Sequence, residues 1–224
     1  MQVYVFDAYG TLFNLHAAAE RYQGAIGPRW QQFSHTWRSK HIEYTWHYTL
    51  TRTPATFWLL AERSLEFASA ATGIEIGHEL RASLLAAYRA MPAYPEVAEV
   101  MNVLKAQGAT LAILSNGDAD MLADAVSSAG LPHVFDAVLS VAPAGAFKPA
   151  QPVYKLASDH FGCRAQDISF QSSNRWDIAG AKAFGFYCVW VNRTGAPDEY
   201  PELPPDRMIA DLRGILPGPA QNPT

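Results

Sequence analysis

Apolar residues follow two different patterns along the chain. Val3 to Phe6 form a short β-prone run that stops at Asp7, with Gly10 soon after, which is typical of a buried strand ending in a turn. From Leu15 to Ala90 the apolar residues recur with helical spacing, and few segments favour strands. The sequence therefore predicts one strand followed by a long helical block.

After Pro92 and Pro95, strands and helices are predicted to alternate. The expected strands are Thr110 to Leu114, Val138 to Val141, Ile168 to Gln171 and Tyr187 to Val191. The expected helices are Glu96 to Gln107, Asp120 to Ala129, Pro152 to Phe161 and Ile178 to Phe184. Because these strands are apolar throughout, we expect an α/β fold whose parallel sheet is covered on both faces.

This alternation also predicts how the chain is divided. Residues 1–14 and 92–224 would form the α/β core domain, which ends in a short Pro- and Gly-rich tail from Pro217. Residues 15–91 would form a helical cap subdomain inserted after the first strand. Within the cap, an aromatic stripe falls within about a 60° arc at helical spacing, and we interpret it as core packing rather than a cofactor site. The stripe consists of Trp30, Phe33, Trp37, Tyr44 and Tyr48.

The composition is that of a folded protein without a nucleic-acid or membrane partner. Of 224 residues, 49% are hydrophobic and 17% charged, so there is enough apolar surface to offset chain entropy, and a net charge of −4 argues against a nucleic-acid-binding face. No stretch approaches the roughly 18 apolar residues of a membrane span. The start M-Q-V-Y-V-F-D lacks the basic region of a signal peptide. Cys163 and Cys188 show no metal-ligand spacing, which favours two core thiols in a reducing, cytoplasmic location.

Polar side chains follow the predicted strands at their carboxyl ends, where parallel sheets bind ligands. They are Asp7, Ser115, Asn116, Lys148 and the residues from Ser172 to Asp177. A carboxylate held there can act as a nucleophile, a lysine beside two carboxylates keeps both ionised, and hydroxyl and amide groups can bind an anion. Each residue alone has a plainer role in a turn, a solvated loop, a helix cap or the core. Their joint order along one α/β pattern favours a catalytic site.

That joint order resembles the haloacid dehalogenase-like hydrolase superfamily over essentially the whole chain. The motifs that carry the resemblance are D-A-Y-G-T-L at 7–12, S-N at 115–116, K-P at 148–149 and S-S-N-R-W-D at 172–177. The D-x-Y and S-S-N-x-W-D variants, together with W-R-S-K-H-I-E-Y-T-W at 37–46, resemble the (S)-2-haloacid dehalogenases, also called L-2-haloacid dehalogenases. The resemblance implies a Rossmann-like parallel sheet core with an inserted helical cap.

Two departures separate this sequence from the phosphatases of the same superfamily. Tyr9 stands where those enzymes carry a second aspartate as general acid, and Ser173 and Asn174 precede a single Asp177 where an acidic pair holds Mg²⁺. An alkoxide leaving group needs a proton, whereas a halide leaves as a stable anion. Fewer carboxylates also weaken the binding of Mg²⁺. The resemblance therefore implies a dehalogenase that uses no metal and no cofactor.

The implied reaction converts short (S)-2-haloalkanoic acids to (R)-2-hydroxy acids through an aspartyl ester on Asp7. Catalytic roles are implied for Asp7, Lys148, Asp177, Asn174, Thr11 and Ser172. Halide binding is implied for Arg38, Asn116 and Trp176, and substrate binding for Ser115, Tyr9, Tyr154, Ile42 and Phe57. Relatives of this type tend to be homodimers, and we expect the same here.

Two other functions stay open at this point. One is a Mg²⁺-dependent phosphatase or phosphonatase of the same superfamily, and the other is a non-catalytic binding protein on this fold. Two positions also depart from the dehalogenase pattern. Ser39 stands where relatives often have a longer glutamine, which would change the pocket volume, and Arg175 stands where they often have a small residue. We expect Arg175 to point to solvent.

Overall fold

The computed structural model describes residues 2–216, so the predicted tail from Pro217 lies outside the described residues. Six parallel strands form one sheet in the order β3-β2-β1-β4-β5-β6. The strands are β1 Val3–Phe6, β2 Thr110–Ser115, β3 Ala137–Ser140, β4 Ile168–Ser172, β5 Tyr187–Val191 and β6 Arg207–Ile209. The parallel sheet expected from the unbroken apolar runs is therefore confirmed.

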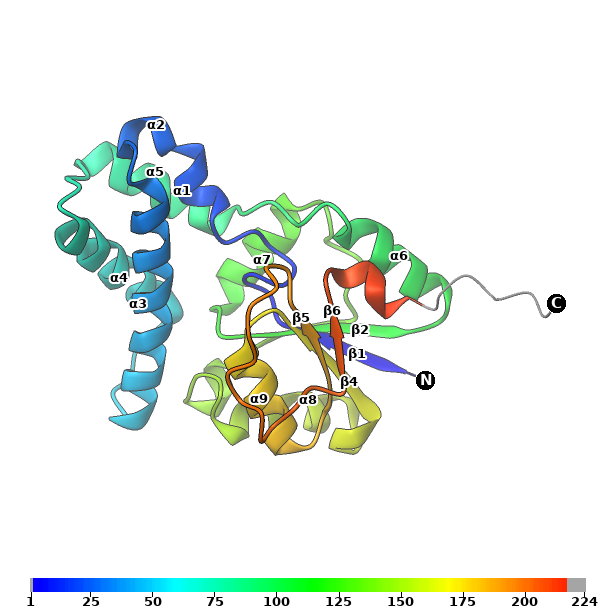
Figure 1. Ribbon diagram of the computed structural model, residues 1–224. Coiled ribbons are helices and arrows are strands. Elements are labelled where there is room, and N and C mark those ends of the chain that lie inside the picture. The colour runs from blue at the N-terminus through cyan, green and yellow to red at the C-terminus, as the bar shows by residue number, and fades with distance from the viewer. Residues whose placement is uncertain (1, 217–224) are drawn as a thin grey trace.

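Helices cover both faces of this sheet, as Figure 1 shows. They are α6 Val97–Ala106, α7 Ala119–Ser128, α8 Gln151–Phe161 and α9 Arg175–Phe184, with short 3₁₀ helices at Ala142–Ala144, Ala165–Asp167 and Leu212–Ile215. Helices α8 and α9 pack together on one face, and α6 lies on the other (Figure 1). This covering buries β2 and β4 completely, and β2 is accordingly apolar at its four central positions, whereas β4 also buries the polar side chains of Ser169, Gln171 and Ser172.

Two predictions about these elements were incomplete. The sequence did not predict β6, because Arg-Met-Ile is a short run at the sheet edge and Met208 is 63% exposed. Helix α9 begins at Arg175, three residues before the predicted start, because its first turn is polar and the apolar period begins only at Ile178. The earlier start places Asp177 in the first turn of α9.

The segment between β1 and α6 is helical, as predicted. Its helices are α1 Ala17–Arg21, α2 Gln23–Ile26, α3 Trp30–Leu50, α4 Phe57–Thr72 and α5 His78–Arg89. Figure 1 shows them gathered on one side of the sheet, apart from α6, α8 and α9. Phe33 and Trp37 of the aromatic stripe are buried, and its other members are half-buried against the hydrophobic core, which confirms the core interpretation. No helix within residues 2–216 has the length and apolar character needed to cross a membrane.

Hydrogen bonds join this helical segment to the sheet domain beside the ends of the strands. The Asp118 carboxylate accepts from the backbone N–H groups of Phe57 at 3.1 Å and Trp58 at 2.8 Å, at the N-terminus of α4. A carboxylate is favourable there because the first N–H groups of a helix lack partners within the helix. The Thr49 hydroxyl likewise accepts from the backbone N–H of Phe147 at 3.0 Å. These contacts hold the helices over the carboxyl end of the sheet.

Candidate active site

The strand order reverses between β1 and β4, which is where ligands bind in open α/β sheets. Asp7 directly follows β1, and its backbone N–H donates to the carbonyl of Gln171 in β4 at 2.9 Å. Gly10 then turns the chain with a φ of +90°, a conformation that favours glycine. This turn brings the hydroxyl of Thr11 back to the Asp7 carboxylate.

The Asp7 carboxylate is held by donors on both oxygens and is only 5% exposed. Its Oδ2 accepts from the Thr11 hydroxyl at 3.0 Å and from Nδ2 of Asn174 at 2.9 Å, while Oδ1 accepts from Nζ of Lys148 at 3.1 Å. Ser172 acts one step away, because its Oγ accepts from the backbone N–H of Asn174 at 3.1 Å. A carboxylate fixed in this way is aimed and largely desolvated, as a nucleophile must be.

Lys148 lies between two buried carboxylates. Its Nζ is 2.9 Å from Oδ2 of Asp177 as well as 3.1 Å from Asp7, and the Lys148 side chain is 1% exposed. Burial alone would lower the pKa of Lys148, but the carboxylates of Asp177 and Asp7 raise it above its usual value. Burial raises the pKa of Asp177 to about 6, against the opposing charge of Lys148. Asp177 is therefore ionised at neutral pH, with a pKa close enough to neutrality for a general base.

Tyr154 supports Asp177 and lies inside the core. Its hydroxyl donates to Oδ1 of Asp177 at 2.9 Å and is 3.2 Å from the Asp177 carbonyl oxygen. Gly180 permits this approach, because a Cβ at that position would collide with the Tyr154 hydroxyl. The sequence had suggested a substrate contact for Tyr154, but its complete burial and its bond to Asp177 assign it a positioning role.

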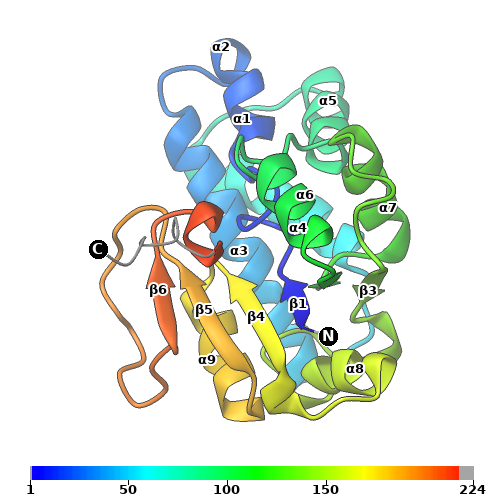
Figure 2. The same cartoon turned by 90° about the vertical axis from the view of Figure 1, so that its right-hand side faces the viewer.

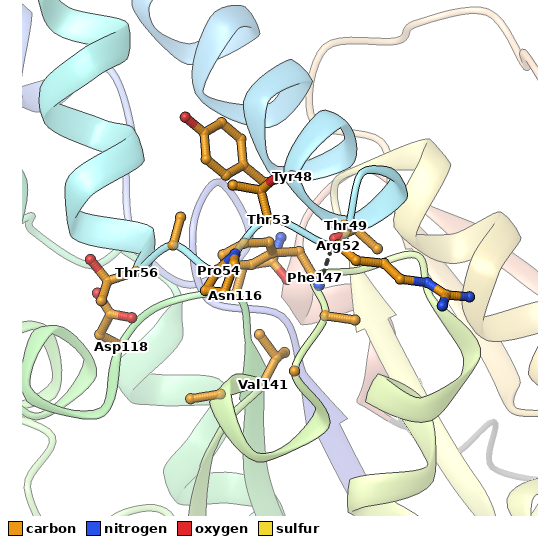
Figure 3. A pocket seen from close by; sticks show the side chains of 14 residues that line it. Tyr48, Thr49, Arg52, Thr53, Pro54, Thr56, Asn116, Asp118, Val141 and Phe147 are labelled. Atoms are coloured by element: carbon orange, nitrogen blue, oxygen red, sulfur yellow. Dashed lines mark hydrogen bonds between the residues drawn. The ribbon is translucent and has the colours of Figure 1, made fainter.

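Ser115 and Asn116 end β2 on the other side of Asp7. The Ser115 hydroxyl accepts from the backbone N–H of Gly117 at 3.2 Å, and Oδ1 of Asn116 accepts from the backbone N–H of Lys148 at 2.9 Å. Asn116 also lines a cavity of about 590 Å³ between the strand ends and the loop after α3. Figure 3 shows Asn116 and Phe147 facing that loop, with the dashed bond from Phe147 to Thr49 at one side.

The side chain of Arg38, on α3, reaches the site from the helical segment. Its Nη2 donates to Oδ1 of Asn174 at 3.4 Å, the same side chain that donates to Asp7. Its Nη1 is buried and has no hydrogen-bond partner within residues 2–216. A buried charged donor without a partner is unfavourable, so this atom marks a place for an anion.

The three residues predicted to bind halide do not all line one cavity. Arg38, Asn174 and Trp176 line a cavity of about 340 Å³, whereas Asn116 lines the larger cavity described above. The Trp176 ring meets the Trp46 ring edge-on at 5.6 Å, which joins α9 to α3. Arg38 and Trp176 are thus brought together by the fold, and the role of Asn116 toward halide stays a prediction.

The predicted apolar wall consists of Tyr9, Phe57 and Ile42, and all three are buried. The Tyr9 ring lies 5.5 Å from the Phe57 ring and 6.0 Å from the Tyr88 ring, nearly parallel to both. The Tyr9 hydroxyl is buried without a partner in the described part of the chain, and burial raises the Tyr9 pKa well above its usual value. Tyr9 therefore stays neutral. With this raised pKa, its hydroxyl is too weak an acid to protonate a leaving group near neutral pH.

His41 is a buried residue that the sequence analysis missed. Its Nε2 donates to the Phe57 carbonyl at 3.1 Å, so Nδ1 accepts from the Tyr88 hydroxyl at 2.9 Å. Burial, with the nearby Arg38 charge, lowers the pKa of His41 to about 3. Its position three residues after Arg38, on the same face of a helix, was the available signal.

Both departures from the dehalogenase pattern lie outside the reacting groups. The expectation that Arg175 points to solvent was wrong, because the residue is 4% exposed and pairs with Asp198. Ser39 is exposed on α3, and it lines neither of the two cavities beside the site residues. The structure therefore gives no support to an effect of Ser39 on the pocket volume.

The residues present do not fit the Mg²⁺ site of the superfamily's phosphatases. Where the phosphatases have an acidic pair, Nδ2 of Asn174 donates to Oδ2 of Asp7 at 2.9 Å and to the Tyr9 carbonyl oxygen at 3.3 Å, so an amide donor stands beside oxygens that a divalent cation would need. A buried aromatic ring occupies the Tyr9 position. Across residues 2–216, no three or more His, Cys, Asp or Glu side chains come together in a group suited to a metal ion.

Comparison with known proteins agrees with this fold. Residues 1–185 match the family model for haloacid dehalogenase-like hydrolases, and the chain belongs to that family. The chain is 38% identical over 220 residues to (S)-2-haloacid dehalogenase 4A of Burkholderia cepacia, covering 98% of this chain and 95% of that protein. A solved dehalogenase structure matches with a TM-score of 0.95 at 37% identity, covering 99% of this chain and 98% of that one. The L-2-haloacid dehalogenase of Xanthobacter autotrophicus, solved with chloropropionic acid covalently bound, matches with a TM-score of 0.84 at 32% identity over 96% of each chain. The resemblance and the α/β fold class expected from the sequence are confirmed.

Proposed function

We propose that this protein hydrolyses short (S)-2-haloalkanoic acids to (R)-2-hydroxy acids, with Asp7 as the nucleophile. The observation that carries the proposal is the Asp7 carboxylate, held by Thr11, Asn174 and Lys148. Arg38 reaches the same site, because its Nη2 donates to Asn174 while its Nη1 has no partner in the described part of the chain. The similarity to (S)-2-haloacid dehalogenases over nearly the whole chain supports it.

In the first step, an Asp7 oxygen attacks C2 of the substrate from behind the carbon–halogen bond. The new C–O bond forms an aspartyl ester, the halide leaves with the bonding electron pair, and C2 is inverted. Arg38 and Trp176 would receive the halide, with Asn116 as a further donor. Fixing the carboxylate beforehand can supply about 7–11 kcal/mol of the barrier when the attack geometry is good.

In the second step, water attacks the carbonyl carbon of the Asp7 ester and releases the hydroxy acid. Asp177 takes a proton of that water, because its pKa of about 6 makes it a base near neutral pH, and returns it to the departing 2-oxygen of the hydroxy acid as the Asp7 carboxyl is restored. Lys148 would stabilise the negative charge that develops on the ester oxygen, since its ammonium is 3.1 Å from Oδ1 of Asp7. Asn174 would orient the water.

Ser115 and nearby backbone N–H groups would hold the substrate carboxylate, and Tyr9, Ile42 and Phe57 would surround the alkyl end of the substrate.

We further propose a cap spanning residues 15–91, a homodimer and a cytoplasmic location. The free thiols of Cys163 and Cys188 support a reducing compartment. Leu50, 83% exposed at the end of α3, lines an apolar hollow with Trp46, Pro149 and Trp176, and this hollow supports an apolar contact between two copies. Light scattering after size-exclusion chromatography tests the dimer, which a monomeric mass would rule out.

Two substrates separate this activity from the alternatives. The purified protein is incubated with (S)-2-chloropropionate and with p-nitrophenyl phosphate, each with and without EDTA. We expect chloride release that EDTA does not change. Phosphate release that EDTA abolishes would identify a metal-dependent phosphatase instead, and no turnover of either compound would favour a binding protein.

A further inference from the structure

Arg175 is buried directly between two residues of the proposed site, Asn174 and Trp176, but its side chain binds another part of the chain. Its Nε is 2.7 Å from Oδ1 of Asp198. Its Nη2 donates to the carbonyl oxygens of Tyr200 at 2.6 Å and Leu203 at 2.9 Å. The Arg175 side chain is 3% exposed, so its guanidinium is buried, while the Asp198 side chain is 38% exposed.

Aromatic rings complete the environment of this guanidinium. Its Cζ lies 5.7 Å from the centre of the Trp190 ring and 5.4 Å from that of Tyr200, within the range of cation–π attraction. The Asp198 carboxylate also accepts from the backbone N–H of Tyr200 at 3.0 Å. Residues 198–203, which we call the clamp segment, are therefore bound to Arg175, the first residue of α9, through Asp198, Tyr200 and Leu203.

The clamp segment belongs to the long connection from β5 to β6. Figure 2 shows this connection as a loop without helix or strand at the edge of the sheet. Residues 194–199 are exposed. The turn that follows β5 is closed by two hydrogen bonds between the Asn192 side chain and the Ala196 backbone, at 2.8 and 2.9 Å. An exposed segment with few buried apolar contacts opens easily unless specific bonds hold it. Arg175 provides those bonds.

The same connection forms one wall of the cavity that Asn174, a partner of Asp7, and Arg175 itself also line. That cavity, of about 340 Å³, is lined by Arg38, Asn174 and Trp176 on the side of the site. Ala196 and Glu199 line it on the side of the connection. The clamp segment contributes Glu199 to this wall, so the position of that segment affects how much room lies next to Arg38 and Trp176, the groups proposed to receive the halide.

We propose that Arg175 is a specificity-determining residue that holds the clamp segment against the start of α9 and so restricts the cavity to acids with short carbon chains. This inference rests on the proposed dehalogenase activity. The inference also explains why Arg175 stands where (S)-2-haloacid dehalogenases often have a small residue. Its guanidinium positions the wall of the cavity and does not contact the reacting atoms.

The test compares (S)-2-chloropropionate with (S)-2-chlorohexanoate as substrates for Arg175→Ala, Arg175→Lys and Asp198→Asn. A pocket wall that excludes methylene groups discriminates by about tenfold or more. We expect Arg175→Ala to raise the ratio of kcat/KM for the longer acid to that for the shorter acid by about tenfold, with smaller increases for the other two variants. Arg164→Ala is the matched control, because Arg164 makes an exposed ion pair with Asp167 and should leave the ratio unchanged.

The ratio separates a specificity role from a structural one. Loss of folded enzyme lowers kcat/KM for both acids equally, so an unchanged ratio in all three variants would overturn the inference. Asp198→Asn keeps the fold testable if Arg175→Ala is poorly folded, since Asp198 is 38% exposed. A wild-type protein that releases halide from neither acid would refute the proposed function, and the inference with it. A wild-type protein that is active with both acids and shows the same ratio as the variants would refute the inference alone.

Discussion

Replacing Lys148 with methionine removes the ammonium that lies between the Asp7 and Asp177 carboxylates, at 3.1 and 2.9 Å. At an effective dielectric constant of about 20, each contact is worth roughly 5 kcal/mol before the cost of burying the charges. Removing one partner of a buried pair costs about 3–5 kcal/mol in practice. We therefore expect Lys148→Met to lower the free energy of unfolding by about 3–5 kcal/mol at pH 8.

The pH dependence of this loss is the sharper part of the prediction. Burial raises the pKa of Asp177 to about 6, and without the opposing ammonium Asp177 takes up a proton still more readily in the folded state than in the unfolded state, so the stability of the variant falls as pH rises. Urea denaturation at pH 5 and pH 8 should show the smaller loss at pH 5. Lys155→Met is the control, because Lys155 pairs with Asp159 on the surface and should cost less than about 1 kcal/mol. A Lys148→Met loss below about 1 kcal/mol, or one equal at both pH values, would refute the reasoning.

Three further predictions concern the remaining groups of the site. Asp177→Asn removes the proposed base, so the variant should release about one equivalent of chloride from (S)-2-chloropropionate and keep an ester on Asp7, which intact mass spectrometry detects. Steady turnover at the wild-type rate would contradict this role for Asp177. Arg38→Lys replaces a guanidinium that can bind Asn174 and an anion together, so kcat/KM should fall by about 10–100-fold. A decrease of less than about threefold would show that Arg38 does not bind the halide. His41 has a folded-state pKa of about 3, below its unfolded value, so stability should fall by about 1.4 kcal/mol per pH unit on acidification from about pH 6.5 toward pH 3. His41→Gln should reduce that slope in urea titrations, and an unchanged slope would show that His41 does not cause it.

The chemistry of the site could be predicted from the sequence because its residues follow buried strands. Asp7 stands at the end of β1 and Ser172 at the end of β4, and parallel strands bring their carboxyl ends to one edge. Lys148 lies in a loop beyond β3, so its pairing with both carboxylates was expected from the family resemblance rather than from this rule.

The contacts that the sequence could not predict depend on how separate elements pack. His41 binds Tyr88, which lies 47 residues away and reaches it only because α5 packs beside α3. Arg175 is buried because the connection from β5 to β6 returns Asp198 to the start of α9. A cation in a polar stretch reads as a solvated residue until such a partner is known.

One labelling experiment tests the central claim that Asp7 is the nucleophile. Enzyme in excess is allowed a single turnover of (S)-2-chloropropionate in H₂¹⁸O, and both the product and the peptide that contains Asp7 are analysed by mass spectrometry. If Asp7 forms the ester, its carboxylate gains ¹⁸O and the lactate formed contains none. Label in the lactate with none in Asp7 would show that water attacks C2 directly, and it would contradict the account.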